Sequence, residues 1–105
     1  MIAKTPSPPY YAVIFTNLRT EIDNGYAEMA VRMEKLALEQ EGCLGVESAR
    51  DGLGITVSYW RDLESIRKWK EHEAHKLAQE KGMKAWYSAY KTRIAFVERD
   101  YEMQK

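Results

Sequence analysis

The chain lacks the features that mark several classes of protein. Its 16 Lys and Arg residues are balanced by 16 Asp and Glu residues, whereas a nucleic-acid-binding domain normally carries a basic excess. No apolar run comes near the ~20 residues of a transmembrane helix, and the first residues lack the apolar segment of a signal peptide. We therefore expect a soluble cytoplasmic protein that binds neither nucleic acid nor membrane.

Cysteine and proline are also scarce. Cys43 is the only cysteine, so no disulfide can form within the chain, and we expect it to be a small buried side chain. All three prolines fall within residues 1–9, which we expect to form an extended, flexible arm. Residues 10–105 then have the length of a single domain.

Motifs for common cofactors are absent from the sequence as well. It contains no GxSxG, no phosphate-binding P-loop and no GxGxxG. His72 and His75 are three residues apart, but neither a third ligand nor an HExxH spacing accompanies them. We therefore expect no metal, flavin or nicotinamide, with haem binding through one of these histidines as the only exception.

What the sequence does contain is an alternation of strand-like and helix-like segments. Runs of aromatic and β-branched residues predict strands over residues 10–18, 43–50, 55–60 and 90–99. Apolar residues at helical spacing predict two long helices between them. The order βαββαβ is that of an α+β, ferredoxin-like fold, in which an antiparallel sheet carries both helices on one face.

Capping residues set the expected limits of the helices. Asp23 or Asn24 can cap the first helix, and Gly42 is expected to end it. Asp62 can cap the second helix, which is expected to run to a break at Gly82. A short helical turn over residues 84–87 should precede the last strand.

Both faces of the predicted sheet are apolar. In the first strand Val13 and Phe15 point to one face, and Ala12 and Ile14 point to the other. An antiparallel sheet with one face in water should instead alternate apolar and polar residues. The helices can cover one face, and a second copy of the chain is the simplest cover for the other. We therefore expect a homodimer built sheet against sheet.

Two residues are candidates for a pocket between the sheet and the helices. Asn17 continues the Val13–Phe15 face, where its amide would either donate a hydrogen bond into a pocket or bond the local backbone. Trp69 lies at the edge of the apolar stripe of the second helix. It would either pack in the core or form a flat wall for an aromatic substrate.

The remaining candidates are aromatic residues and histidines. Trp60, Trp86, Tyr87 and Tyr90 would either bind a substrate or pack in the core or a dimer interface. On an ideal helix His72 and His75 fall beyond the apolar stripe, so they would reach a pocket only through a kink. A neutral imidazole in a pocket would serve as a base near pH 7; otherwise both are surface residues.

The chain resembles the antibiotic biosynthesis monooxygenase (ABM) family over nearly its whole length. The resemblance is strongest at residues 59–60, 75–79, 82, 86–87, 90, 93 and 97–101. It implies a small ferredoxin-like domain that pairs into a dimeric α+β barrel, with a pocket between the sheet and the helices of each subunit.

Haem-degrading relatives in this family use a strand asparagine, a helix tryptophan and a helix histidine. Asn17 and Trp69 match the first two, but Gln79 stands where the resemblance places the histidine. Glutamine is a poorer axial ligand for iron than imidazole is. The resemblance therefore favours an activity found in other members of the family over haem degradation. It leaves Gln79 as a residue that would contact a substrate.

Cofactor-free relatives oxidise aromatic, polyketide-like substrates in an apolar pocket. By that resemblance Asn17 would donate to a developing oxyanion, His72 or His75 would be the base, and Trp69 with Trp60 would hold the ring system. The function expected is a cofactor-independent monooxygenase acting on a small aromatic or quinol-type molecule. The alternatives are a non-catalytic small-molecule-binding or stress-related dimer, or a haem-degrading enzyme.

Overall fold

The computed structural model describes residues 1–78 and 83–105, and it has the predicted βαββαβ order. Its elements are, in chain order, β1 Tyr10–Arg19, α1 Tyr26–Leu38, β2 Cys43–Asp51, β3 Leu53–Trp60, α2 Leu63–Ala78, α3 Met83–Trp86 and β4 Tyr87–Val97. The predicted break at Gly82 and the candidate Gln79 lie outside the described residues. None of the helices in the described part is long and apolar enough to cross a membrane.

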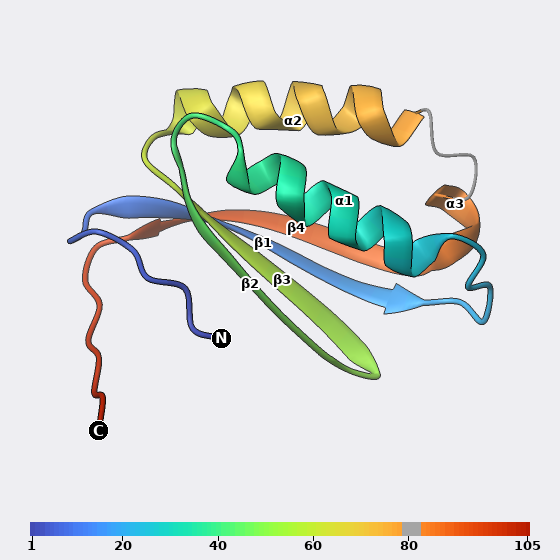
Figure 1. Cartoon of the computed structure of the whole chain (residues 1–105), viewed down its shortest axis with the longest axis horizontal. Helices are drawn as coiled ribbons and strands as arrows, with labels where there is room; N and C mark the ends of the chain where they lie inside the picture. The colour runs from blue at the N-terminus through green and yellow to red at the C-terminus, as the bar shows by residue number, and fades with distance from the viewer. Residues whose placement is uncertain (79–82) are drawn as a thin grey trace.

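The strands form one antiparallel sheet in the order β2-β3-β1-β4. Both long helices lie over the same face, and the two termini lie on the other side (Figure 1). This is the expected ferredoxin-like fold. Because β1 pairs with both β3 and β4, residues from all parts of the chain meet on its helix-covered face.

The register of the sheet decides which side chains meet under the helices. Val13 of β1 is paired with Ser58 of β3, and Asn17 is paired with Gly54 of β3 and Tyr90 of β4. Since side chains alternate along a strand, Asn17 shares its face with Val13 and Phe15, as the sequence predicted.

The core lies between the sheet and α2. Trp60 is fully buried, and its ring stacks on that of Trp69, with 6.0 Å between centroids and 24° between planes. Val13, Ala37 and Ile66 complete the buried cluster. Trp69 therefore lies in the core of the protein and not at the edge of the apolar stripe, because α2 turns this position toward the sheet.

One of the two predicted helix caps is confirmed. The backbone N–H of Ser65 donates to Asp62 Oδ1 at 2.8 Å, as an N-cap aspartate requires. The cap predicted for α1 at Asp23 or Asn24 is wrong. Gly25 occupies the cap position in the left-handed conformation, and no side chain bonds the first turn there. Glycine takes that conformation without a steric cost, which lets the chain turn sharply out of β1.

The face of the sheet opposite the helices is partly covered by the chain's own ends. In the arm over residues 1–9, the N–H of Ala3 donates to Glu47 Oε2 at 2.8 Å. At the same end of the sheet the Tyr10 hydroxyl donates to Asp100 Oδ2 at 2.6 Å. Three large apolar side chains at the other end of this face remain 40–47 % exposed: Leu18, Leu53 and Ile55.

Gly42, between α1 and β2, lies in close contact with α2, and this contact can be tested by substitution. Its backbone has φ +89°, and a Cβ there would overlap the buried side chain of Ser65. Gly52 at the β2–β3 hairpin has φ +77°, with open space where a Cβ would be. Gly52→Ala should therefore cost only the left-handed strain, about 1–2 kcal/mol.

Gly42→Ala carries the same strain and the overlap with Ser65, and should lower the unfolding free energy by about 2–4 kcal/mol. Urea unfolding of both variants at one protein concentration measures the difference. Equal losses in the two variants would contradict the close approach at Ser65.

Candidate functional site

A cavity of about 670 Å³ lies between the sheet and the two long helices. Its floor comes from all four strands and its walls from α1 and α2. Most of the lining is apolar or aromatic, and it includes Phe15, Met29, Met33, Trp69 and Tyr90. This volume falls within the range of small-molecule sites, about 300–1,000 Å³.

Aromatic rings form a continuous wall on one side of the cavity. Phe15 contacts Tyr87 and Tyr90, with 5.6 Å between ring centroids in each pair. Trp69 supplies a second flat surface from α2, and it is held in place by its stacking on Trp60. Large rings with few rotatable bonds give a ligand contact area at low entropic cost.

A polar group closes one part of this apolar cavity. Asn17 is only 3 % exposed, and its Oδ1 accepts a hydrogen bond from Arg50 Nη2. Because a guanidinium only donates, this contact fixes which amide atom faces Arg50. The NH₂ group of Asn17 is then the part of the amide that can donate to a bound molecule.

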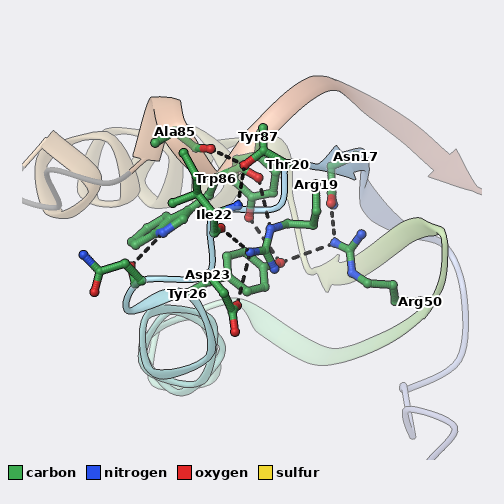
Figure 2. A network of polar contacts seen from close by, with 11 residues as sticks. Asn17, Arg19, Thr20, Ile22, Asp23, Tyr26, Arg50, Ala85, Trp86 and Tyr87 are labelled. Carbon is green, nitrogen blue, oxygen red and sulfur yellow. Dashed lines mark hydrogen bonds and ion pairs between the residues drawn. The ribbon is translucent and has the colours of Figure 1, made fainter.

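Two tyrosines extend this polar group (Figure 2). Tyr26 Oη accepts from Arg50 Nη2 at 3.3 Å and from the Tyr87 hydroxyl at 3.4 Å. The Arg19 guanidinium lies 3.3 Å from the centroid of the Tyr26 ring. We refer to Asn17, Tyr26, Arg50 and Tyr87 as the polar cluster.

The polar cluster shifts the titration of its tyrosines in opposite directions. Burial alone would raise the pKa of Tyr26, but the hydrogen bonds from Tyr87 and Arg50 and the charges of Arg50 and Arg19 together lower it below 10.0. Burial and the hydrogen bond to Tyr26 raise the pKa of Tyr87. Tyr26 is therefore the more acidic hydroxyl of the pair, and its own proton is free to face a ligand.

A carboxylate also faces the cavity. Glu73 lines the cavity from α2, one turn after Trp69. Burial raises the pKa of Glu73 above its ordinary value of 4.5, although Lys70 Nζ, 3.9 Å away, acts in the opposite direction. A half-buried carboxylate of this kind is a stronger base than an exposed one.

The histidines predicted as bases lie elsewhere. His72 packs its ring 5.9 Å from that of Trp69, and His75 is exposed. Within residues 1–78 and 83–105, neither lines the cavity, and no three potential ligands come together to hold a metal ion. Glu73 lines the cavity from this helix because it follows Trp69 by one turn and so shares its face.

The aromatic candidates divide into two groups. Tyr90 and Trp69 line the cavity. Trp60 is behind Trp69 and donates its Nε1–H to Ser58 Oγ at 2.8 Å, while Trp86 donates its Nε1–H to the carbonyl of Asn24 at 2.8 Å. In the described part of the chain, Trp60 and Trp86 are core residues that support the wall from outside.

Sequence reasoning missed Arg50, Tyr26 and Glu73 as site residues, and it considered Tyr87 only as one of the aromatic candidates. Signals for two of them were present. Glu73 follows Trp69 by four residues and so shares its helix face. Arg50 is paired with Gly54 across the Asp-Gly hairpin, which brings it beside Asn17. The contribution of Tyr26 and Tyr87 depends on the tertiary contact between α1 and β4.

The raised pKa of Glu73 has a consequence for stability. The folded protein holds a proton on this carboxyl to a higher pH than the unfolded chain does, so the unfolding free energy declines as the pH rises above 4.5. Glu73→Gln removes that decline. The variant should unfold at a higher urea concentration than the parent at pH 7, and the difference should disappear toward pH 4.

Glu71→Gln is the matched control for this measurement. Glu71 lies on the exposed side of the same helix, where it pairs with Arg67. This variant should keep the parent's decline in stability with pH. A Glu73→Gln protein with the parent's pH profile would show that Glu73 is ionised as readily in the folded protein as in the unfolded chain.

Comparison with known proteins identifies the family of the chain. The model of the family described as antibiotic biosynthesis monooxygenase (ABM) matches residues 9–81. An uncharacterized protein, YqjZ of Bacillus subtilis (strain 168), is 51% identical over 106 residues, which cover 99% of this chain and 93% of YqjZ.

Solved structures share the fold at low sequence identity. SnoaB, a cofactor-independent oxygenase from Streptomyces nogalater, has a TM-score of 0.67 at 9% identity, covering 93% of this chain and 100% of SnoaB. A putative antibiotic biosynthesis monooxygenase from Chloroflexus aurantiacus J-10-fl has a TM-score of 0.64 at 18% identity, covering 90% and 99%. The family model matches most of the sequence, and YqjZ is 51% identical over nearly all of it: the chain belongs to the antibiotic biosynthesis monooxygenase family.

Proposed function

We propose that this protein is a cofactor-independent monooxygenase that acts on a small aromatic or quinol-type molecule. The observation that carries the proposal is the cavity of about 670 Å³ in which the buried amide of Asn17 faces a wall of aromatic rings. Family membership and the fold shared with the oxygenase SnoaB support it.

The cavity suits a flat, fused-ring substrate. Trp69 and Phe15 present apolar surfaces from opposite layers of the protein, one from α2 and one from β1. A planar substrate between them would displace water from both surfaces. Each Å² of apolar surface removed from water contributes about 25 cal/mol to binding, before the entropy cost of association.

The chemistry requires a base, a donor for the developing oxyanion and two substrate hydrogens. For a substrate with an acidic methylene between aromatic rings, Glu73 takes one proton and leaves an enolate-like carbanion. The carbanion reduces dioxygen and binds one of its oxygen atoms as a new carbonyl. The second oxygen leaves as water with the two hydrogens of the former methylene, so the reaction needs no external reductant.

Glu73 is assigned the role of base in place of His72 or His75 because, of these three residues, it is the one that lines the cavity. Asn17 is assigned the role of donor. Its amide is fixed by Arg50 before substrate binds, so it need not reorganise as negative charge develops on the substrate oxygen. Preorganised donors of this kind contribute about 10²–10³ to the rate.

Asn17→Ala should therefore lower the turnover number about 10²-fold. The assay is oxygen uptake with a panel of anthrones, hydroquinones and catechols. Asn24→Ala is the matched control, because the Asn24 side chain is exposed and, among the described residues, its hydrogen bond is made by the backbone carbonyl. It should keep the parent's rate.

Two outcomes would count against the proposal. If no substrate in the panel consumes oxygen above background while tryptophan fluorescence reports binding, the protein is a binding protein that keeps the fold without the chemistry. If Asn17→Ala unfolds or dissociates the protein, its loss of activity reflects a structural role. A melting temperature and an elution volume equal to those of the parent remove that explanation.

We also propose that the protein is a homodimer built through the sheet face opposite the helices. The support is the exposed apolar patch of Leu18, Leu53 and Ile55, which the chain's own ends leave open. Isolated apolar side chains are common on protein surfaces, but a contiguous group on a sheet face is typical of an interface.

Ile55→Glu should convert the dimer to monomers, because a carboxylate would be buried there without a partner. Sedimentation velocity at micromolar concentration measures the change. Val31→Glu is the control, since Val31 is 68% exposed on α1, away from the sheet. A parent protein that sediments as a monomer, or a dimer that Ile55→Glu leaves intact, would contradict this interface.

A further inference from the structure

We infer that the natural substrate carries a carboxylate, and that Arg50 binds it at the polar cluster. This inference rests on the proposed function in so far as it names the substrate class, but the binding preference itself does not depend on turnover. The observation behind it is a positive charge at the cavity that the protein does not neutralise.

The cations around the cavity differ in their partners. Lys70 is 3.9 Å from Glu73, and Arg19 Nη2 is 3.3 Å from Asp23 Oδ1. Arg50 lines the cavity, and among the described residues its contacts are all to neutral groups: Asn17 Oδ1, Tyr26 Oη and the carbonyl of Gly52. Its charge is therefore available to a ligand.

The position of Arg50 is built by several residues. Its Nη2 donates to both Asn17 and Tyr26, which come from β1 and α1. Across the β2–β3 ladder it is paired with Gly54, and a Cβ at residue 54 would overlap the guanidinium. Gly54 is not in a positive-φ conformation, so the backbone does not require glycine there. The absence of a side chain makes room for the Arg50 head group.

The groups beside Arg50 also suit an acidic ligand. The three hydrogen bonds that Arg50 makes to described residues use three of its five N–H donors, which leaves two for a carboxylate. Tyr26 accepts two hydrogen bonds, so its own O–H can donate to the same ligand, as can the NH₂ of Asn17. Arg50 is an exposed residue that also lines the cavity, and a neutral substrate would leave its guanidinium without an anionic partner.

The test compares a flat aromatic acid with its neutral amide. Calorimetric titration with naphthoate and naphthamide should show that the acid binds the parent protein at least about tenfold more tightly, the range expected for a hydrogen bond to a charged group. Arg50→Gln should abolish this preference. Arg93→Gln should keep it, because Arg93 is an exposed cation on the opposite face of the sheet and its removal changes the net charge equally.

Gly54→Ala is the sharper variant, because it keeps the charge of Arg50 and moves only its guanidinium. It should lose the preference for the acid while the protein stays folded, as a cooperative thermal transition would show. The inference would be overturned if the parent bound the acid and the amide equally, or bound neither. It would also be overturned if the preference survived in Arg50→Gln or Gly54→Ala, or if it were lost in Arg93→Gln. An acid preference in a protein that consumes no oxygen would leave the inference standing and reject the monooxygenase proposal.

Discussion

The stacking of Trp60 on Trp69 is the contact on which the rest of the structure depends. Trp60 is fully buried in β3, and Trp69 covers it from α2. Removing a buried tryptophan side chain typically costs about 3–5 kcal/mol, a large part of the stability of a domain this small. Because Trp69 also lines the cavity, the wall of the site is held by the same contact that holds the helix to the sheet.

The tryptophan contact joins one helix to one strand. In the polar cluster, by contrast, each member comes from a different element. Asn17 is on β1, Tyr26 on α1, Arg50 on β2 and Tyr87 on β4. Their hydrogen bonds join side chains that lie far apart in sequence, from 24 to 61 residues between partners. The cluster therefore orients its donors only when the sheet is complete, and a rigid sheet keeps them aligned without a ligand.

Much of the fold could be predicted from the sequence because its signals are local. The Asp-Gly hairpin, the Asp62 cap and the alternation of strands and helices each depend on residues close together in the chain, and they gave the element order correctly. The site was harder to predict. Asn17 and Trp69 follow from strand and helix faces, but the choice of Glu73 over His72 depends on the exact rotation of α2 over the sheet. The role of Arg50 depends on the space that Gly54 leaves beside it.

The strand order has a consequence for the synthesis of the protein on the ribosome. β1 is the first strand to be made and lies in the middle of the sheet, between β3 and β4. Its ladder with β4 joins Tyr10 to Val97, so one side of β1 has no partner in the sheet until β4 has been translated. An apolar strand with an unpaired edge is prone to associate with other chains. The nascent protein is therefore most exposed to aggregation in the interval before its last strand leaves the exit tunnel.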